Sequence, residues 1–113
     1  MWATWCGSCR DELPHLQELY ENVKEYPGIQ IVTFNADEDV GLVAPFVKEE
    51  GYTFPVLLAN SFVWGQLKLS GIPQNWIVDP KGAWTWIQGG FDVRNPNWKQ
   101  EIIQKLEAVQ ASK

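Results

Sequence analysis

Two cysteines placed three residues apart at the start of a predicted helix constrain this chain more than any other feature. Cys6 and Cys9 are its only cysteines, and they stand in the run Trp-Ala-Thr-Trp-Cys-Gly-Ser-Cys-Arg at residues 2–10. On an α-helix the Cα atoms of residues i and i+3 lie roughly 5 Å apart, a separation that a disulfide tolerates. The pair can therefore be a redox dithiol, half of a metal site, or a coincidence.

The position of the pair at a helix N-terminus favours redox chemistry. The unpaired N–H groups and partial positive charge of a helix N-terminus stabilise a thiolate relative to a thiol. Because Cys6 is the more N-terminal residue, we expect its pKa to fall from about 8.5 toward 7 or below. Cys9 lies one turn further into the helix, where it is suited to resolve a mixed disulfide. We therefore predict that Cys6 attacks and Cys9 resolves.

A zinc site is the weaker interpretation. Structural zinc has four ligands, and the only histidine, His15, is the one residue that could join the cysteines. We predict instead that His15 is a surface or partly buried helix residue, and that the chain needs no metal and no cofactor. Asp37, Glu38 and Asp39 are predicted to form a solvated turn and helix cap. The alternative is that one of these three carboxylates accepts the proton of Cys9.

Length and charge limit the domain count and the class of partner. At 113 residues the chain is predicted to form one domain spanning residues 1–113. A net charge of −5 without a basic cluster argues against nucleic acid or an anionic membrane as the main partner. No apolar run approaches the ~20 residues that cross a bilayer, and no secretory signal is present.

The apolar periodicity predicts an alternation of helices and strands. Leu13, Leu16, Tyr20 and Val23 recur at helical spacing, which predicts an amphipathic helix from Cys6 to Tyr26 that is kinked at Pro14. The remaining predicted elements are a strand buried on both faces at Ile29–Phe34, a helix at 40–50 ended by Gly51, a short edge segment at 55–58, one or two helical turns at 62–69, a hairpin of strands 74–78 and 83–88, and a last helix from Asn95 or Pro96 to about Val109.

The chain carries seven tryptophans, of which most are predicted to fill the core or its rim. Trp2 and Trp5 are the predicted exceptions. They flank the cysteines, and we expect both to line the surface that a partner meets.

With these motifs the chain resembles the thioredoxin superfamily, and within it the TlpA/ResA-like branch of bacterial thiol-disulfide oxidoreductases. The residues that carry the resemblance are the Trp-Ala-Thr-Trp-Cys-x-x-Cys-Arg block, Pro14 in the first helix, and Ile72-Pro73 followed by a strand and an Asp-Pro-x-Gly turn. The gap between Cys6 and Pro73 also fits the segment that TlpA-like proteins insert in mid-fold, here roughly residues 38–60. The resemblance covers essentially the whole chain.

The resemblance implies a function as well as a fold. It implies a thioredoxin-like α/β fold, a mixed sheet flanked by helices, and a cis bond between Ile72 and Pro73. It also implies that Trp5, Gly7, Ser8, Ile72 and Pro73 bind protein substrates that carry disulfides or dithiols. The resemblance further implies an extracytoplasmic or periplasmic protein, often membrane-tethered, that reduces disulfides, for example in cytochrome c maturation.

The chain departs from the family at its start and around the site. The family places an apolar central strand directly before the cysteine block, between the strands predicted here at 29–34 and 74–78. We therefore expect the chain to be an excised domain or to have a mis-annotated start. The two strands would then pair directly, stay loosely packed, or recruit a strand from another copy. Gly7-Ser8 replaces the usual Gly-Pro, and Gln74-Asn75-Trp76 replaces the commoner Thr-Thr-Phe.

Two other functions remain open on the sequence. The first is a redox-silent protein-interaction module with a vestigial cysteine pair. The second is a thiol peroxidase, since peroxiredoxins share the fold, although a Cys-x-x-Cys at the helix start argues against it.

Overall fold

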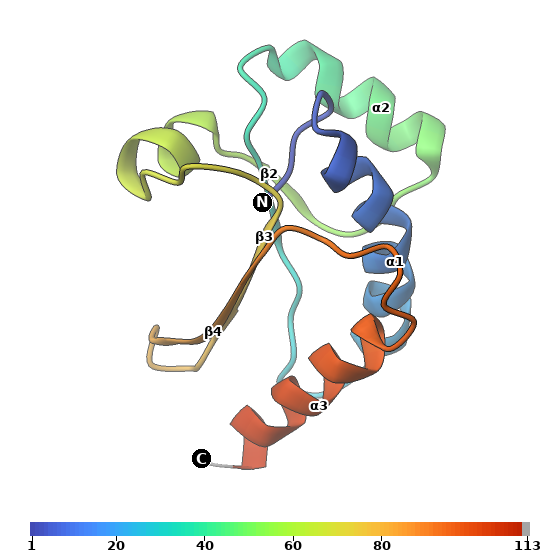
Figure 1. Ribbon diagram of the computed structural model, residues 1–113, viewed down its shortest axis with the longest axis vertical. Helices are drawn as coiled ribbons and strands as arrows, with labels where there is room; N and C mark the ends of the chain where they lie inside the picture. The colour runs from blue at the N-terminus through green and yellow to red at the C-terminus, as the bar shows by residue number, and fades with distance from the viewer. Residues whose placement is uncertain (112–113) are drawn as a thin grey trace.

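The computed structural model describes residues 1–111, and its helices and strands follow the predicted order (Figure 1). The π-helical segment η2 and the 3-10 turn η1 supplement the α-helices. The elements are α1 (Gly7–Val23), β1 (Thr33–Asn35), η1 (Val40–Leu42), α2 (Val43–Glu50), β2 (Val56–Leu58), η2 (Phe62–Gln66), β3 (Gln74–Val78), β4 (Trp84–Gly89) and α3 (Trp98–Ala111).

Helix α1 supplies much of the core. Leu13, Leu16, Leu19 and Val23 recur on one face, and all four are buried. The helix contains the predicted proline but ends at Val23, three residues before the predicted Tyr26. The reason is local, because a residue that precedes proline is disfavoured in the helical conformation and Pro27 follows Tyr26.

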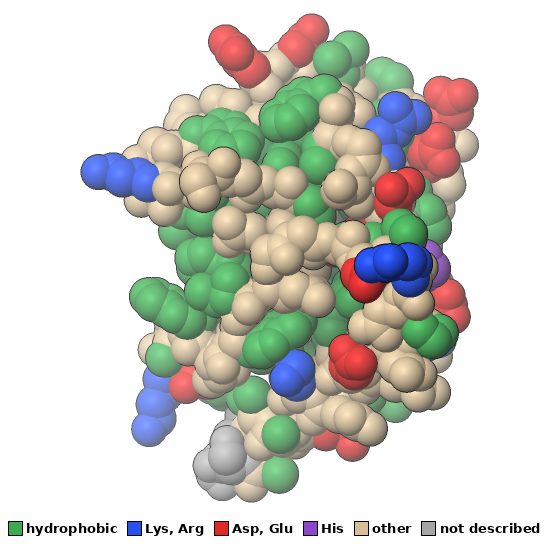
Figure 2. Space-filling view, viewed as in Figure 1, with side chains coloured by type: hydrophobic (Ala, Val, Ile, Leu, Met, Phe, Trp, Pro, Cys, Tyr) green, Lys and Arg blue, Asp and Glu red, His purple; other side chains and the backbone are tan. Residues whose placement is uncertain are grey.

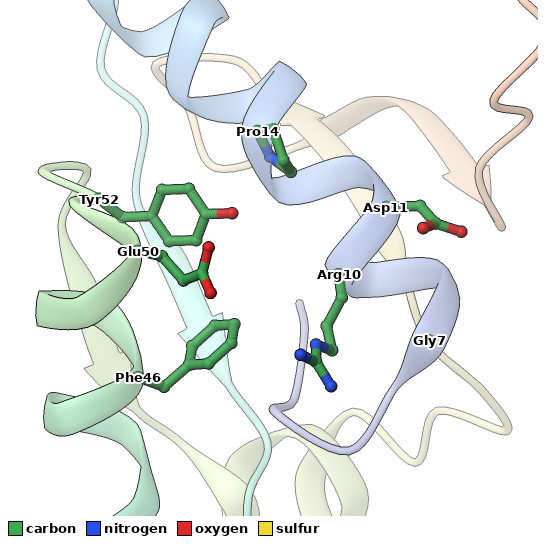
Figure 3. Close-up of a pocket in the computed structure, with 7 residues that line it drawn as sticks. All are labelled: Gly7, Arg10, Asp11, Pro14, Phe46, Glu50 and Tyr52. Carbon is green, nitrogen blue, oxygen red and sulfur yellow. The ribbon is translucent and has the colours of Figure 1, made fainter.

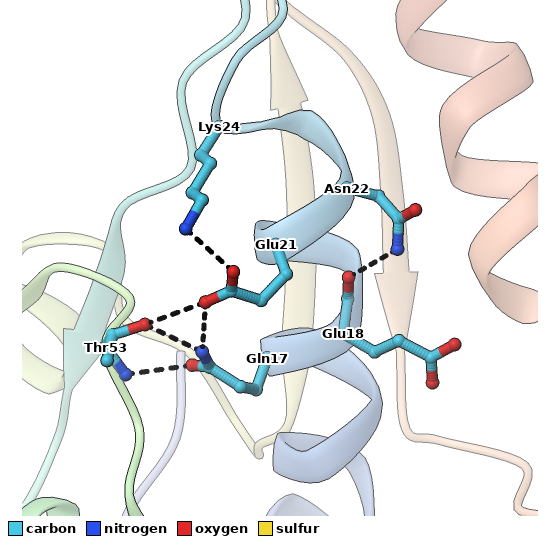
Figure 4. Close-up of polar contacts among 6 residues, drawn as sticks. All are labelled: Gln17, Glu18, Glu21, Asn22, Lys24 and Thr53. Carbon is cyan, nitrogen blue, oxygen red and sulfur yellow. Dashed lines mark hydrogen bonds and ion pairs between the residues drawn. The ribbon is translucent and has the colours of Figure 1, made fainter.

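Polar contacts fix α1 against the loop after α2 (Figure 4). The Thr53 backbone N–H donates to Oε1 of Gln17 at 2.9 Å, and Nε2 of Gln17 donates to the Thr53 hydroxyl at 2.7 Å. That hydroxyl donates in turn to Glu21. Since Gln17 and Thr53 are 36 residues apart in sequence, these bonds set the distance between α1 and the inserted segment.

Helices α2 and α3 close the core on either side of α1. Val43 of α2 and Trp98 and Ile102 of α3 are buried in the same cluster as the apolar face of α1. Gly51 ends α2 in the left-handed conformation with φ 76°, as predicted. The predicted helix at 40–50 is divided: residues 40–42 form a separate 3-10 turn before α2, and Leu42 in that turn is 52% exposed.

The strands form two separate pairs rather than one continuous sheet. Strands β1 and β2 pair in parallel, and β3 and β4 form the predicted antiparallel hairpin. Two residues bridge the pairs: Trp2 makes ladder hydrogen bonds to Phe34 and Ala36, and Met1 bonds to Gln74. β1 and β3 therefore do not pair directly with each other. Direct pairing, one of the three expected outcomes for these strands, is thus excluded.

The predicted strand at Ile29–Phe34 is shorter than expected and is not buried on both faces. Only Thr33–Asn35 is regular strand, and Val32 is 49% exposed. A groove of about 620 Å³ lies between residues 28–30, residues 77–80 and α3. Residues 29–32 thus lack a neighbouring strand on that side, and without ladder hydrogen bonds they do not adopt regular strand structure.

Apolar surface is gathered on the side of the molecule that carries η2 and the β3–β4 hairpin, at the left in Figure 2. Phe62, Val78 and Trp84 are exposed on these elements. In the part of the chain that the structure describes, no helix has the length and apolarity to cross a membrane.

Candidate active site

The cysteine pair lies at the N-terminus of α1, as its spacing predicts. Cys6 is the residue before the first turn, in an extended conformation with φ −91° and ψ 111°. The Cys9 backbone N–H points at the Cys6 sulfur, with N and Sγ 3.2 Å apart. A disulfide joins the two residues across a Cα–Cα distance of 5.2 Å. Cys6 is 7% exposed and Cys9 is fully buried, so a partner can reach only Cys6.

The loop before β3 lies against the first cysteine. The carbonyl oxygen of Ile72 is 3.7 Å from Sγ of Cys6, although the two residues are 66 positions apart. The Ile72–Pro73 peptide bond is cis, and Pro73 is buried while Ile72 is half-buried. A hydrogen bond of 2.9 Å from the Gly90 N–H to the Pro73 carbonyl ties this loop to the end of β4. The fold thus brings Ile72 and Pro73 to Cys6.

The other predicted substrate-binding residues lie on the open side of the pair. Trp5 is 62% exposed, and its ring stacks on Trp64 of η2 with centroids 6.4 Å apart. Gly7 and Ser8 are exposed between the cysteines. Trp2 was predicted to share this surface, but that prediction is wrong: Trp2 is 2% exposed and packs edge-on against Phe54, because it occupies the inner ladder position between the two strand pairs.

A cleft of about 410 Å³ lies beside the disulfide, between the start of α1 and α2 (Figure 3). The Arg10 guanidinium extends from α1 toward the aromatic ring of Phe46, whose centroid is 5.7 Å away. Glu50 and Tyr52 form the facing wall. Since Gly7 of the cysteine motif also lines it, the cleft is continuous with the surface around the pair.

The acidic turn after β1 is only partly solvated. Glu38 is exposed, and Asp39 caps η1 by accepting a hydrogen bond from the Gly41 N–H at 3.1 Å, as predicted. Asp37, predicted to be solvated as well, is 1% exposed. The reason is that its carboxylate binds Thr4 and Asn35, which draws it under the loop before Cys6.

Glu12 is the buried acid that the sequence prediction missed. It follows Cys9 by one helical turn on the buried face of α1 and is 4% exposed. Burial raises the pKa of its carboxyl above the ordinary 4.5, and a hydrogen bond from Asn75 partly opposes that rise. Its spacing from Leu16 and Leu19 is the helical signal that places Glu12 on the inner face.

The metal-site interpretation depends on where His15 and the acidic side chains lie. His15 is exposed and lies against the rings of Phe91 and Trp98, away from the cysteines, in agreement with its predicted helix position. Among residues 1–111, no group of three or more His, Cys, Asp or Glu side chains is arranged to hold a metal ion.

Comparison with known proteins places this site in a family. Residues 1–87 match the model of the AhpC/TSA family. A thiol-disulfide oxidoreductase ResA of Bacillus cereus is 34% identical over 82 residues, which are 72% of this chain and 47% of ResA. ResA of Bacillus thuringiensis subsp. konkukian is 35% identical over 112 residues, or 96% of this chain and 60% of the relative. The chain thus spans about half the length of the curated relatives it matches.

Solved structures share the fold. A Chlorobium tepidum protein assigned as the thiol:disulfide interchange protein DsbE superimposes with a TM-score of 0.79 at 26% identity, covering 96% of this chain and 74% of that protein. StoA from Bacillus subtilis gives a TM-score of 0.72 at 24% identity over 88% of this chain and 75% of StoA. The chain belongs to the AhpC/TSA family and is a TlpA/ResA-like member of the thioredoxin superfamily.

Proposed function

We propose that this chain is a thiol-disulfide oxidoreductase domain that exchanges electrons with the cysteines of partner proteins through Cys6 and Cys9. The observation that carries the proposal is the disulfide at the N-terminus of α1, with Sγ of Cys6 held 3.7 Å from the Ile72 carbonyl. The sulfurs are themselves the redox group, so the reaction needs no cofactor. The names of the ResA and DsbE relatives support the same activity.

The proposed reaction follows from the different burial of the two sulfurs. In the reducing direction the Cys6 thiolate attacks a substrate disulfide, forms a mixed disulfide and releases one substrate thiolate. The Cys9 thiol then loses its proton and attacks Sγ of Cys6, which releases the second substrate thiolate and forms the Cys6–Cys9 disulfide. Two electrons pass from the Cys6–Cys9 dithiol to the substrate. The helix N-terminus stabilises the Cys6 thiolate.

Glu12 is the proposed acceptor of the Cys9 proton. Cys9 is fully buried, so its thiol cannot pass its proton directly to bulk water. Glu12 lies one helical turn away on the same buried face, and its raised pKa brings its affinity for a proton closer to that of a thiol.

Trp5, Gly7, Ser8, Ile72 and Pro73 form the proposed docking surface. The exposed ring of Trp5 supplies apolar contact area, and the half-buried backbone at Ile72 can pair with an extended substrate strand. We further infer an extracytoplasmic setting, which rests on the resemblance to TlpA/ResA-like proteins.

Reduction of insulin by dithiothreitol tests the proposed activity. Wild-type protein should accelerate the precipitation of insulin chains, and Cys6→Ser should abolish that acceleration. If the wild type and Cys6→Ser both leave the rate unchanged, the chain is the redox-silent interaction module instead. A thiol peroxidase would consume hydrogen peroxide faster than it reduces insulin, so a peroxide assay on the same preparations separates that activity.

A further inference from the structure

A buried carboxylate outside the cysteine pair holds the loop that leads into it. Oδ2 of Asp37 accepts a hydrogen bond from the Thr4 backbone N–H at 2.9 Å, and Oδ1 accepts one from the Thr4 hydroxyl at 2.6 Å. Both oxygens of one carboxylate therefore bind both donors of one residue. This two-point contact fixes the orientation of Thr4 as well as its position.

Asn35 holds Asp37 in place through two further hydrogen bonds. Nδ2 of Asn35 donates to Oδ2 of Asp37 at 2.7 Å, and the Asp37 backbone N–H donates to Oδ1 of Asn35 at 3.0 Å. Asn35 is fully buried at the end of β1, and Asp37 is 1% exposed. None of the ion pairs of the described residues involves Asp37. Three neutral donors hold the buried carboxylate, two on Oδ2 and the Thr4 hydroxyl on Oδ1. Loss of that hydroxyl would leave Oδ1 without a donor among the described contacts, which is costly for a buried polar atom.

Thr4 stands two residues before Cys6, within the turn that starts α1. The Cys6 backbone N–H closes this turn on the Ala3 carbonyl at 3.2 Å. Cys6 then presents Sγ to the Cys9 N–H as the cap of the helix. A rotation of Thr4 would change the direction in which the chain enters α1, and with it the position of Sγ relative to the helix N–H groups.

The same segment also supports the residue between Thr4 and Cys6. The Ala36 carbonyl accepts a hydrogen bond of 3.1 Å from the indole N–H of Trp64, on which Trp5 stacks. The turn after β1 thus contacts Thr4 directly and Trp5 through one intermediate ring.

We propose that Asp37 is a positioning residue for the Cys6 thiolate, acting through its two hydrogen bonds to Thr4. The proposal rests on the proposed oxidoreductase function. Asp37 touches neither sulfur in the described contacts and takes no part in electron transfer. It keeps Sγ of Cys6 aligned with the N-terminus of α1, where the helix stabilises the thiolate.

The test measures the reactivity of Cys6 rather than turnover. In a Cys9→Ser background, the rate of alkylation by iodoacetamide as a function of pH reports the thiolate fraction of Cys6. Thr4→Val removes one hydrogen bond without changing the net charge. Asp37→Asn replaces one of the two acceptor oxygens by an NH₂ donor, and so breaks the two-point contact with Thr4. Because the thiolate fraction falls about tenfold for each unit by which the pKa rises above the pH, we expect both variants to slow alkylation at pH 7 by about 3- to 10-fold.

Two controls separate position from charge and from stability. Thr4→Ser keeps the hydroxyl and should restore the rate to within about twofold of the parent. Asp39→Asn removes the same charge from an exposed carboxylate in the same turn, and it should leave the pH profile unchanged.

Three outcomes would overturn the proposal. Thr4→Val and Asp37→Asn could lower the melting temperature while their pH profiles overlay the parent, which would make Asp37 a purely structural residue. Asp37→Asn could speed alkylation while Thr4→Val leaves it unchanged, which would make charge the operative property. If Asp37→Asn does not fold, an unchanged profile in Thr4→Val is sufficient to reject the positioning role. Alkylation does not require reduction of a protein substrate. The alkylation rates can therefore be interpreted even if the insulin assay shows no activity.

Discussion

The buried carboxylate of Glu12 accepts a hydrogen bond from Nδ2 of Asn75 at 3.0 Å, which joins α1 to β3 directly beneath the cysteine pair. The two residues are 63 positions apart in sequence. One hydrogen bond from a neutral amide offsets only part of the cost of burying a carboxylate charge. Glu12 is therefore held in the site at the expense of stability whenever it is ionised.

This cost predicts a pH dependence that Glu12→Gln removes. The folded pKa of Glu12 is raised above the unfolded value near 4.5, so between the two values the native state binds more protons than the unfolded state. The associated stability is fully present below pH 4.5 and is lost as the pH rises through the folded pKa. Glu12→Gln stays neutral and can still accept from Asn75, so it should be more stable than the wild type at pH 8.

Urea unfolding of the two proteins from pH 4 to pH 8 measures this difference. The gap between Glu12→Gln and the wild type should shrink toward zero or change sign as the pH falls below the folded pKa. A gap that is the same at every pH would mean that the two side chains differ in packing and not in ionisation.

Trp5→Ala should separate docking of protein substrates from thiol chemistry. The side chain is 62% exposed, so its removal should change the free energy of unfolding by no more than about 0.5 kcal/mol. Insulin reduction should slow by about tenfold, since loss of a large aromatic contact at an interface costs on the order of 1–2 kcal/mol. The reaction with a small aromatic disulfide should keep its rate. Equal slowing of both reactions would mean that Trp5 affects the reactivity of the cysteine sulfur and not the docking of protein substrates.

Leu19→Ala tests the packing that supports α1. Leu19 is 2% exposed in the central cluster, and truncation of a buried leucine of this kind costs about 2–5 kcal/mol. Glu18→Gln is the adjacent control: its ion pair with Lys99 is at the surface, so its loss should lower the melting temperature far less than Leu19→Ala does. Thermal unfolding of both variants checks the contrast, and a small effect at Leu19 would contradict the assigned core.

The sequence was sufficient to predict the parts of the fold that depend on local patterns. The periodicity of Leu13, Leu16 and Val23 located α1, and the Asp-Pro-x-Gly turn located the hairpin of β3 and β4. The positions of Cys6 and Cys9 at the start of the helix followed from their spacing and the residues after them. Each of these features depends on residues that are close together in the sequence.

Predictions of side-chain burial failed where the contacting residue is distant in the sequence, although the expected approach of Ile72 and Pro73 to Cys6 was confirmed. Asp37 was expected in solvent because its neighbours are polar, but its binding partner Thr4 is 33 positions away. Trp2 was expected at the surface because it flanks the cysteines, whereas the ladder contacts with β1 bury it. Glu12 was not among the predicted site residues. Its helical spacing from Leu16 and Leu19 places it on the inner face of α1, but the hydrogen bond it accepts there comes from Asn75, 63 positions away.

Mixed-disulfide trapping tests most directly the claim that Cys6 is the attacking residue. Each single-cysteine variant is incubated at pH 7 with oxidised glutathione, and mass spectrometry follows the adduct. Cys9→Ser, which keeps Cys6, should form the adduct at least about tenfold faster than Cys6→Ser, because its sulfur is both accessible and stabilised as a thiolate. An adduct that forms equally fast or faster on Cys9 would contradict the account.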